Sequence, residues 1–271
     1  TSEGVSLGRA SGDRTTLASA LLSQSYALRR AGRTDDAADA AAEVEALISS
    51  EDRWLALTAL ETKATLVGIR GDYESSARLL QELRDKHRVL GNRTAAIILG
   101  QNLAEWERAL GNTERAVVIA REAMADIQGA PTRFESVFVV GACNLIGYLV
   151  ALDRLAEAKA TAHELLLRHG SDATHIGQNS FALEHLSLVF ALEGDDARAA
   201  QLAAHADATL RSLGYEREFA EKATRTRLDA LLAERLLSDQ RESLTTRGAA
   251  MRNEEAVALA LAALEEPSDD A

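Results

Sequence analysis

The chain has 271 residues, and its 42 acidic residues outnumber its 30 Lys and Arg residues, which gives a formal charge of −12. Nucleic-acid binding relies on clustered Lys and Arg, so this balance argues against such a surface. With 46% hydrophobic residues, 4% aromatic residues and two prolines, the composition is typical of a helical protein with a sizeable core. A disordered chain and an all-β fold are therefore disfavoured, and we expect an all-α fold.

The single cysteine, Cys143, cannot form an intramolecular disulfide and suits a reducing compartment, so we expect a cytoplasmic location. The longest uncharged stretch, residues 137–152, is shorter than the roughly 20 apolar residues of a membrane span. We expect a buried helix there and no membrane partner. The chain begins at Thr1 without an initiator Met, which indicates a piece excised from a longer protein.

Short turn motifs recur along the chain at intervals of 39, 40, 42 and 41 residues. Each motif lies between two stretches that have apolar residues at helical spacing, for example 95–110 and 114–127. Each unit therefore predicts a helical hairpin. Its glycine can end the first helix in the left-handed conformation, and the Asp, Asn or Thr that follows can cap the second helix. The turns begin at Gly32, Gly71, Gly111, Asp153 and Gly194.

Small residues occupy two fixed positions in these units, one on each helix of the hairpin. Small side chains on facing helices let the two backbones approach closely, so we expect each hairpin to close through these positions. The alternative is that an alanine-rich chain places alanine there by chance. Five residues after the turn stand Ala37, Ser76, Ala116, Ala158 and Ala199, and seven before it stand Ser25, Ala64, Ala104, Ile146 and Ser187. The second position is small in four of the five units, and in the exception, Ile146, the small residue Gly147 is adjacent.

This pattern resembles the tetratricopeptide repeat, which has a small residue in its first helix, Gly followed by Asp or Asn in its turn, and Ala five residues later. The resemblance covers residues 13–214 and departs from the family in a period near 40 in place of 34 and in lacking a proline after each second helix. It implies a right-handed α-solenoid of about five hairpins with a concave face of first helices. We expect residues 1–214 to form this repeat array.

Beyond residue 214 the spacing breaks, and we expect residues 215–266 to form capping helices, with a frayed tail over 267–271. An amphipathic stretch over 219–237 leads to Gly248 and then to a Glu-Glu-Ala-Val segment that opens an Ala/Leu helix. We expect Asn253 to cap that helix. Lengthened repeats with this ending look like the C-terminal halves of bacterial STAND-type regulators, a class that includes transcriptional and cyclase-linked signalling proteins. The resemblance implies a nucleotide-binding switch domain upstream of this chain.

Motifs for catalysis and metal binding were sought and not found. A phosphate-binding loop needs a Gly-Lys pair, and the sequence has none. His163-Glu164 followed by His169 has a spacing of six where a zinc-binding H-E-x-x-H motif requires four. The two rings would lie about 120° apart around a helix and could not share a metal. We expect no cofactor, no metal and no enzymatic activity in this chain.

The two tryptophans and the cysteine are expected to lie in the core, although each also has a functional alternative. Trp54 and Trp106 stand in first helices and are expected to anchor the core of an alanine-rich chain, with ligand stacking as the alternative. Cys143 lies in the apolar stretch over 137–152, so we expect a buried and unreactive thiol there and not a nucleophile.

One row of residues points to binding. The position nine residues before each turn is polar in all five units, although it lies inside a first helix. In the tetratricopeptide family, which the chain resembles, this position faces the concave groove and can bond a bound peptide. A solvated helix face that is simply polar is the alternative. The row is Ser23, Thr62, Asn102, Asn144 and His185, flanked one residue earlier by Glu61, Gln101 and Glu184.

Taken together, these patterns favour a non-catalytic sensing and protein-interaction domain from a larger bacterial regulator. Its groove would bind an inducer, a peptide or a partner protein, and the negative charge favours cationic or neutral partners. One alternative is a stand-alone tetratricopeptide scaffold or peptide receptor. The other is an α-helical enzyme, for which the sequence offers no acid/base pair at a recognisable spacing. The oligomeric state is left open.

Overall fold

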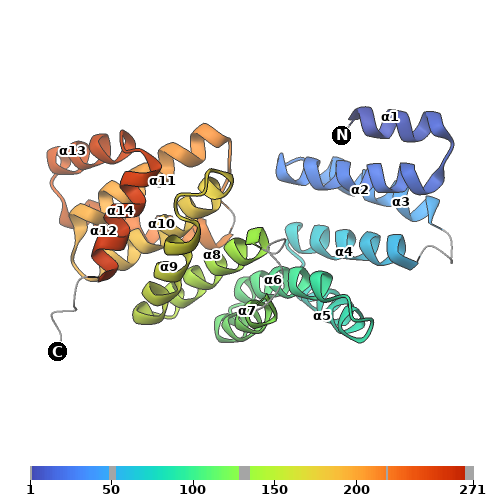
Figure 1. Ribbon diagram of the computed structural model, residues 1–271, viewed down its shortest axis with the longest axis horizontal. Helices are drawn as coiled ribbons and strands as arrows, with labels where there is room; N and C mark the ends of the chain where they lie inside the picture. Colours follow the sequence, from blue (N-terminus) through green and yellow to red (C-terminus); the bar gives the residue numbers. More distant parts are fainter. Residues whose placement is uncertain (1, 49–52, 128–134, 218, 266–271) are drawn as a thin grey trace. The chain divides into compact units, whose positions relative to one another are not determined.

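The computed structural model describes residues 2–48, 53–127, 135–217 and 219–265 (Figure 1). Within these ranges the chain forms 14 α-helices and one 3-10 turn and contains no strand, which confirms the all-α prediction. The chain divides into two compact units, here called the N-terminal unit (Thr1–Leu110) and the C-terminal unit (Gly111–Ala271). Each unit is described by itself.

In the N-terminal unit, successive helices pack against each other along the chain. First helices also contact one another, because α2 packs on α4 and α4 packs on α6. The core of this unit lies between these helices and includes Leu21, Val44, Leu80 and Leu103, all nearly inaccessible to solvent. The helices are α1 (Ser2–Ser11), α2 (Arg14–Arg30), α3 (Thr34–Leu47), α4 (Arg53–Ile69), α5 (Tyr73–Val89) and α6 (Arg93–Ala109).

In the C-terminal unit, α8 and α10 form the centre, and the other helices surround them. Helix α8 packs on α7, α9, α10 and α12, while α10 packs on α8, α9, α11, α12 and α14. The helices are α7 (Thr113–Ile127), α8 (Glu135–Ala151), α9 (Leu155–His169), α10 (Ile176–Leu192), α11 (Asp196–Leu213), α12 (Phe219–Arg235), α13 (Ser238–Ala249) and α14 (Asn253–Glu265), with a 3-10 turn, η2 (Ala173–His175), before α10.

The five turn residues all have a positive φ, as the spacing predicts, from 54° at Asp153 to 98° at Gly71. The residue that follows each of four of these turns donates its N–H to a carbonyl five residues back, for example Asp195 to Phe190 at 2.8 Å. Asp72 and Asp195 then cap α5 and α11 by accepting an N–H from the first turn, as expected.

At α3 and α9 the capping prediction is wrong. The cap residues there are Arg33 and Arg154, and neither side chain makes a capping hydrogen bond. An arginine has no acceptor for the free N–H groups of a first turn. Each guanidinium pairs instead with a carboxylate in that turn, Arg33 with Asp36 at 2.7 Å and Arg154 with Glu157 at 2.6 Å. Those carboxylates lie at the positive end of the helix.

The small residues do bring paired helices together. Ser25 Oγ donates to the Ala37 carbonyl at 2.7 Å, and Ser76 Oγ donates to the Ala64 carbonyl at 2.6 Å. Each bond runs from one predicted small position to the other, across α2–α3 and across α4–α5. In the C-terminal unit the corresponding residues, Ile146, Ala158, Ser187 and Ala199, are fully buried.

The apolar stretch over 137–152 forms α8, and most of its side chains are buried, as predicted. None of the described helices is long and apolar enough to cross a lipid bilayer.

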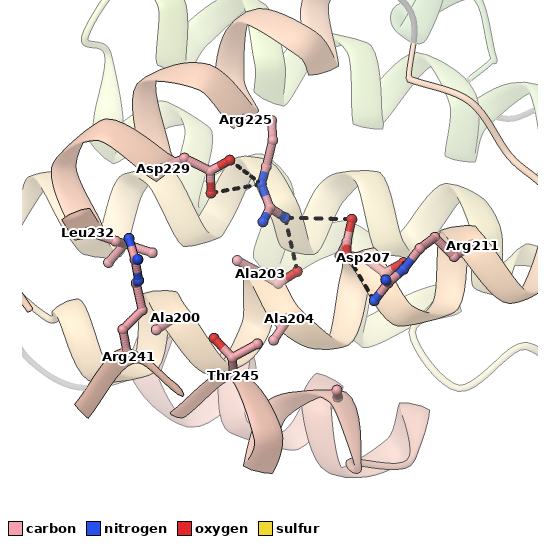
Figure 2. Close-up of a pocket in the computed structure, with 11 residues that line it drawn as sticks. Ala200, Ala203, Ala204, Asp207, Arg211, Arg225, Asp229, Leu232, Arg241 and Thr245 are labelled. Carbon is pink, nitrogen blue, oxygen red and sulfur yellow. Dashed lines mark hydrogen bonds and ion pairs between the residues drawn. The ribbon is translucent and has the colours of Figure 1, made fainter. Parts of the chain in front are cut away.

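The tail forms three helices that pack on different neighbours. Helix α13 lies on α11 and α14 lies on α9 and α11, whereas α12 lies along the first helices α8 and α10. Between α11, α12 and α13 is a cavity of about 390 Å³ (Figure 2).

Helix α14 begins at Asn253, but the expectation that Asn253 caps it is wrong. Residue Arg252 precedes the helix, and its N–H donates to Glu255 Oε2 at 2.9 Å, so Glu255 takes up the free N–H. The Asn253 amide donates instead to the Gly170 carbonyl at the end of α9, at 2.8 Å. His205 Nδ1 of α11 bonds the Met251 carbonyl at 3.2 Å. These contacts fix the start of α14 to the C-terminal unit.

Candidate functional site

The polar row of the N-terminal unit lies on α2, α4 and α6 and is open in part. Ser23 is exposed, while Thr62 and Asn102 are half-buried. The hydroxyls of Ser23 and Thr62 donate to carbonyls one turn back in their own helices, at 3.0 Å and 2.9 Å. A hydroxyl that donates one bond can still accept another, so these positions remain able to bind a ligand's donors.

The flanking residues of this unit are less accessible. Glu61 Oε1 lies 2.6 Å from Nε2 of His87, a buried residue of α5. Burial raises the pKa of the Glu61 carboxyl, although the neighbouring His87 opposes the rise. Gln101 is buried, with 8% of its surface exposed. Of the two flanking residues, only Glu61 thus keeps part of its surface accessible.

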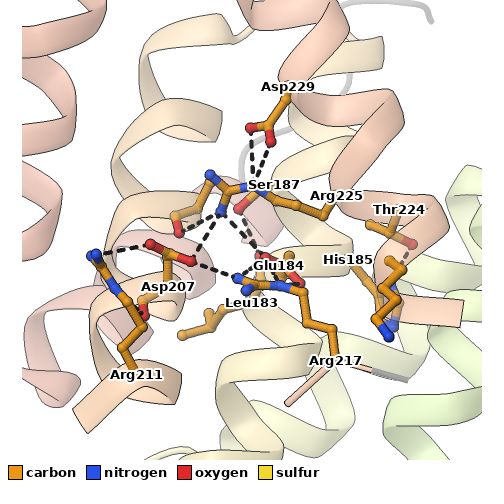
Figure 3. A network of polar contacts seen from close by, with 12 residues as sticks. Leu183, Glu184, His185, Ser187, Asp207, Arg211, Arg217, Thr224, Arg225 and Asp229 are labelled. Atoms are coloured by element: carbon orange, nitrogen blue, oxygen red, sulfur yellow. Dashed lines mark hydrogen bonds and ion pairs between the residues drawn. The ribbon is translucent and has the colours of Figure 1, made fainter. Parts of the chain in front are cut away.

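In the C-terminal unit, α12 covers the row position His185 and its neighbour Glu184. His185 is 1% exposed, and its Nδ1 bonds Thr224 Oγ1 of α12 at 2.9 Å (Figure 3). Glu184 is fully buried. Asn144 is half-buried on α8. The structure therefore brings Glu184 and His185 together against α12, and neither can meet an external ligand while α12 is in place.

The His185 ring also explains a glycine of the neighbouring first helix. A Cβ on Gly147 of α8 would lie 2.7 Å from His185 Nε2, closer than real Cβ contacts. The absence of a side chain at Gly147 therefore makes room for the imidazole between α8 and α12. The ring is fixed on one side by close packing and on the other by the bond to Thr224.

Glu184 is the centre of an ion-pair network in Figure 3 that joins α10, α11 and α12. Arg217, just before α12, binds Glu184 Oε1 at 2.6 Å and Asp207 Oδ1 at 3.0 Å. Arg225 of α12 lies 3.4 Å from Glu184 Oε1 and binds both oxygens of Asp229 at 2.9 Å. The hydrogen bond to Glu184 raises the pKa of Arg217, which favours the charged guanidinium. A buried carboxylate with two guanidiniums secures α12 over the row.

Four residues of this network, Thr224, Arg217, Arg225 and Asp207, were missed by sequence reasoning. Thr224, Arg217 and Arg225 lie 33 to 41 residues along the chain from the Glu184 or His185 side chain that they contact. Asp207 lies on the next helix, α11, and no sequence motif connects these residues. The only available signal was a cluster of arginines in an amphipathic tail.

The cavity between α11, α12 and α13 lies next to this network. Its floor is made of the buried residues Ala200, Ala203, Ala204 and Leu232. Charged side chains form its rim, and Figure 2 shows Arg225 spanning the space between Asp229 on its own helix and the Ala203 carbonyl and Asp207 of α11. The other lining residues are Arg211, Arg241, Thr245 and Ala249.

The expected core residues behave as predicted where they can be seen. Trp106 is buried and stacks on Tyr73 with ring centroids 5.5 Å apart, whereas the side chain of Trp54 lies outside the described residues. Cys143 is buried, and its Sγ lies 3.1 Å from the Gln178 carbonyl. Burial raises the pKa of the Cys143 thiol, and the nearby Glu221 of α12 adds to the rise. The thiol is therefore held in its unreactive protonated form.

One histidine outside the row has an ordered set of partners. His175 Nδ1 lies 3.1 Å from Asp172 Oδ2, and His175 Nε2 lies 3.2 Å from Ser136 Oγ on α8. The Thr174 hydroxyl lies 2.7 Å from the same Nδ1. Among the described residues, no group of three or more His, Cys, Asp or Glu side chains could hold a metal ion.

No family model matches this chain, and no curated protein matches it.

Proposed function

We propose that this chain is a non-catalytic sensing and protein-interaction domain of a larger bacterial signal-transduction or transcription regulator. In this proposal its hairpins form a right-handed, tetratricopeptide-like solenoid in the cytoplasm. The polar row binds an inducer, a peptide or a partner protein, and the binding biases a switch domain elsewhere in the same polypeptide. The segment itself contacts no nucleic acid.

The observation that carries the proposal is that one row position, His185, already holds a helix together with its neighbour Glu184. In the C-terminal unit the row position His185 and its flanking residue Glu184 bind α12 through Thr224, Arg217 and Arg225. Helix recognition by a groove of packed helices uses this combination of a polar anchor and close packing. The face of the first helices thus has the chemistry to bind an added segment, here one from the same chain.

The N-terminal unit offers the same positions to an external segment. Ser23 is exposed, and Thr62 and Asn102 keep part of their surface accessible on adjacent first helices. Hydroxyl and amide side chains can pair with the backbone of an extended peptide or with polar residues of a helix. This unit is therefore the proposed docking site for the external partner.

Peptides selected from a displayed library on the purified chain test the proposal. We expect the best peptide to bind the Thr62→Ala, Asn102→Ala double variant at least about tenfold more weakly than the parent chain. The variant loses both hydrogen bonds between neutral groups and packing contacts. Fluorescence polarisation gives the affinities, and the thermal melt is expected to change little.

The matched control is Glu82→Ala, Lys86→Ala, which removes two exposed side chains from the second helix α5. It should bind the peptide like the parent. Equal affinity of the parent and the Thr62/Asn102 variant would exclude the row as the binding site. The regulator part has its own test, because the encoding reading frame is expected to continue upstream into a nucleotide-binding domain.

A second candidate function, an α-helical hydrolase, is favoured by one observation. Ser136, His175 and Asp172 are hydrogen-bonded in the order nucleophile, base and orienting acid that acyl transfer requires. A fluorophosphonate probe decides between the two functions. Labelling of Ser136 that is lost in His175→Ala would support the hydrolase, whereas an unlabelled protein supports the binding domain.

A further inference from the structure

The cavity between α11, α12 and α13 is built by one stripe of residues from each helix. Helix α11 contributes Ala200, Ala203, Ala204 and, beyond them, Asp207 and Arg211. These residues are three or four positions apart, so they share one face of the helix. Because three of them are alanines, no large side chain of α11 fills the space that these residues line.

Close contact at one end of α13 fixes this geometry. A Cβ on Gly248 would lie 2.1 Å from the Gln201 carbonyl oxygen, so α13 touches the backbone of α11 there. From that crossing point α13 presents Ala249, Thr245 and Arg241 in successive turns to the cavity. The cavity is about 390 Å³, within the roughly 300–1,000 Å³ range of small-molecule sites.

The charges around the cavity do not balance. Asp207, Asp229 and the buried Glu184 are paired with Arg211, Arg217 and Arg225. The Arg241 side chain, by contrast, makes no hydrogen bond or ion pair with the described part of the chain. Figure 2 shows its side chain reaching from α13 toward Leu232 of α12, at the edge of the alanine floor. The mouth of the cavity therefore carries one uncompensated positive charge beside an apolar floor.

We propose that this cavity binds a small amphipathic monocarboxylate. Its carboxylate pairs with the Arg241 guanidinium, assisted by the Thr245 hydroxyl one turn along the same helix, because both groups can donate to an anion. Its aliphatic part lies on Ala200, Ala203, Ala204 and Leu232. This site is separate from the polar row, and it stands whether or not the row binds a partner.

Sodium octanoate is the probe, and the intact chain carrying ¹³C-labelled alanine methyl groups is the reporter. We expect octanoate to shift the methyl signals of Ala200, Ala203 and Ala204 in a saturable way. Octylammonium and 1-octanol have the same chain length with a positive or a neutral head group. They should bind at least tenfold more weakly, because only the carboxylate complements Arg241.

Two variants and one matched control complete the test. Arg241→Gln is expected to weaken octanoate binding about tenfold, whereas Arg247→Gln, an equal charge change on another face of α13, should leave it unchanged. Ala203→Leu fills the cavity and should abolish the shifts. The site is overturned if octanoate causes no saturable shift in the parent, if octylammonium binds as well, or if the two arginine variants weaken binding equally. The arginine variants decide the matter even where Ala203→Leu fails to fold.

Discussion

Glu61 of α4 and Glu184 of α10 occupy the same place in their hairpins, ten residues before the turn, but their surroundings differ. Glu61 keeps 24% of its side chain exposed and has one histidine neighbour, His87. Glu184 is fully buried and is bound by two arginines that belong to or precede α12. The difference comes from α12, a helix that the repeat pattern does not include.

This comparison shows that a repeat position has no fixed role. In the N-terminal unit the polar row of first helices is partly open and its hydroxyls bond their own helices. In the C-terminal unit the row position His185 lies in the interior while Asn144 is half-buried, and most of α10 is buried. An added helix such as α12 can bury a polar helix face, provided that it supplies a partner for every polar group that it buries.

The largest expected effect is at Glu184. Replacing it by Gln leaves Arg217 and Arg225 without a buried anion, and we expect the C-terminal unit to lose about 3 kcal/mol of stability. Both tryptophans, Trp54 and Trp106, lie in the N-terminal unit, so their fluorescence follows that unit while far-UV circular dichroism follows both. In urea the variant should shift the dichroism transition and leave the fluorescence transition in place.

The matched substitution is Glu61→Gln in the N-terminal unit. Its carboxyl is partly exposed, so the change should cost less than the change at Glu184 and should appear in tryptophan fluorescence. Equal losses of unfolding free energy in the two variants would mean that covering by α12 does not strengthen the ion pairs of Glu184.

The next effect in size is at Gly147, which lies against the His185 ring. A methyl group there would overlap Nε2, so Gly147→Ala should destabilise the C-terminal unit by about 1–3 kcal/mol. The double variant with His185→Ala should recover part of this loss, because the clashing ring is gone. Urea unfolding followed by circular dichroism measures both. Additive losses in the double variant would show that the two residues are not in contact.

A smaller effect is expected at the hairpin contacts. Ser76→Ala removes the bond to the Ala64 carbonyl and should cost about 1 kcal/mol in the N-terminal unit, measured by tryptophan fluorescence in urea. Thr62→Ala removes a hydroxyl that bonds only its own helix among the described contacts, and it should cost less. A larger cost at Thr62 than at Ser76 would contradict the interhelical role of Ser76.

The smallest expected effect is a difference between the two units in how their stability depends on pH. Burial is the main cause that lowers the pKa of His169 and of His205, both in the C-terminal unit, below the ordinary value of 6.5. The unfolded chain then binds more protons than the folded one below about pH 6.5, so this unit loses stability as the pH falls. Burial raises the pKa of Glu61 in the N-terminal unit, so that carboxyl contributes stability at low pH and loses it as the pH rises through the raised value.

Lowering the pH from about 7.5 to about 5.5 should therefore reduce the urea midpoint seen by circular dichroism more than the midpoint seen by tryptophan fluorescence. His205→Asn should reduce this difference. Midpoints that fall in parallel in the parent would contradict the assignment of the pH-sensitive groups to the C-terminal unit.

Local features of the fold were predictable because they depend on neighbours in the chain. Gly32 and Gly71 end helices in the left-handed conformation, and Asp72 and Asp195 cap the helices that follow. The contact of Ser76 with Ala64 follows from small residues at a fixed distance on either side of a turn. The caps at α3 and α14 differ from the prediction because Arg33 before α3 has no side-chain acceptor, whereas the Glu255 carboxylate accepts the Arg252 N–H before α14.

The sequence by itself determined the helices, their turns and the two small positions through which paired helices touch, since each depends on residues within a single hairpin. It also marked the polar row. Only the tertiary structure decided which part of that row is open, because α12 covers Glu184 and His185 with residues more than 30 positions away. The cavity beside Arg241 has the same origin, since space between three helices depends on their packing and not on any one stretch of the chain.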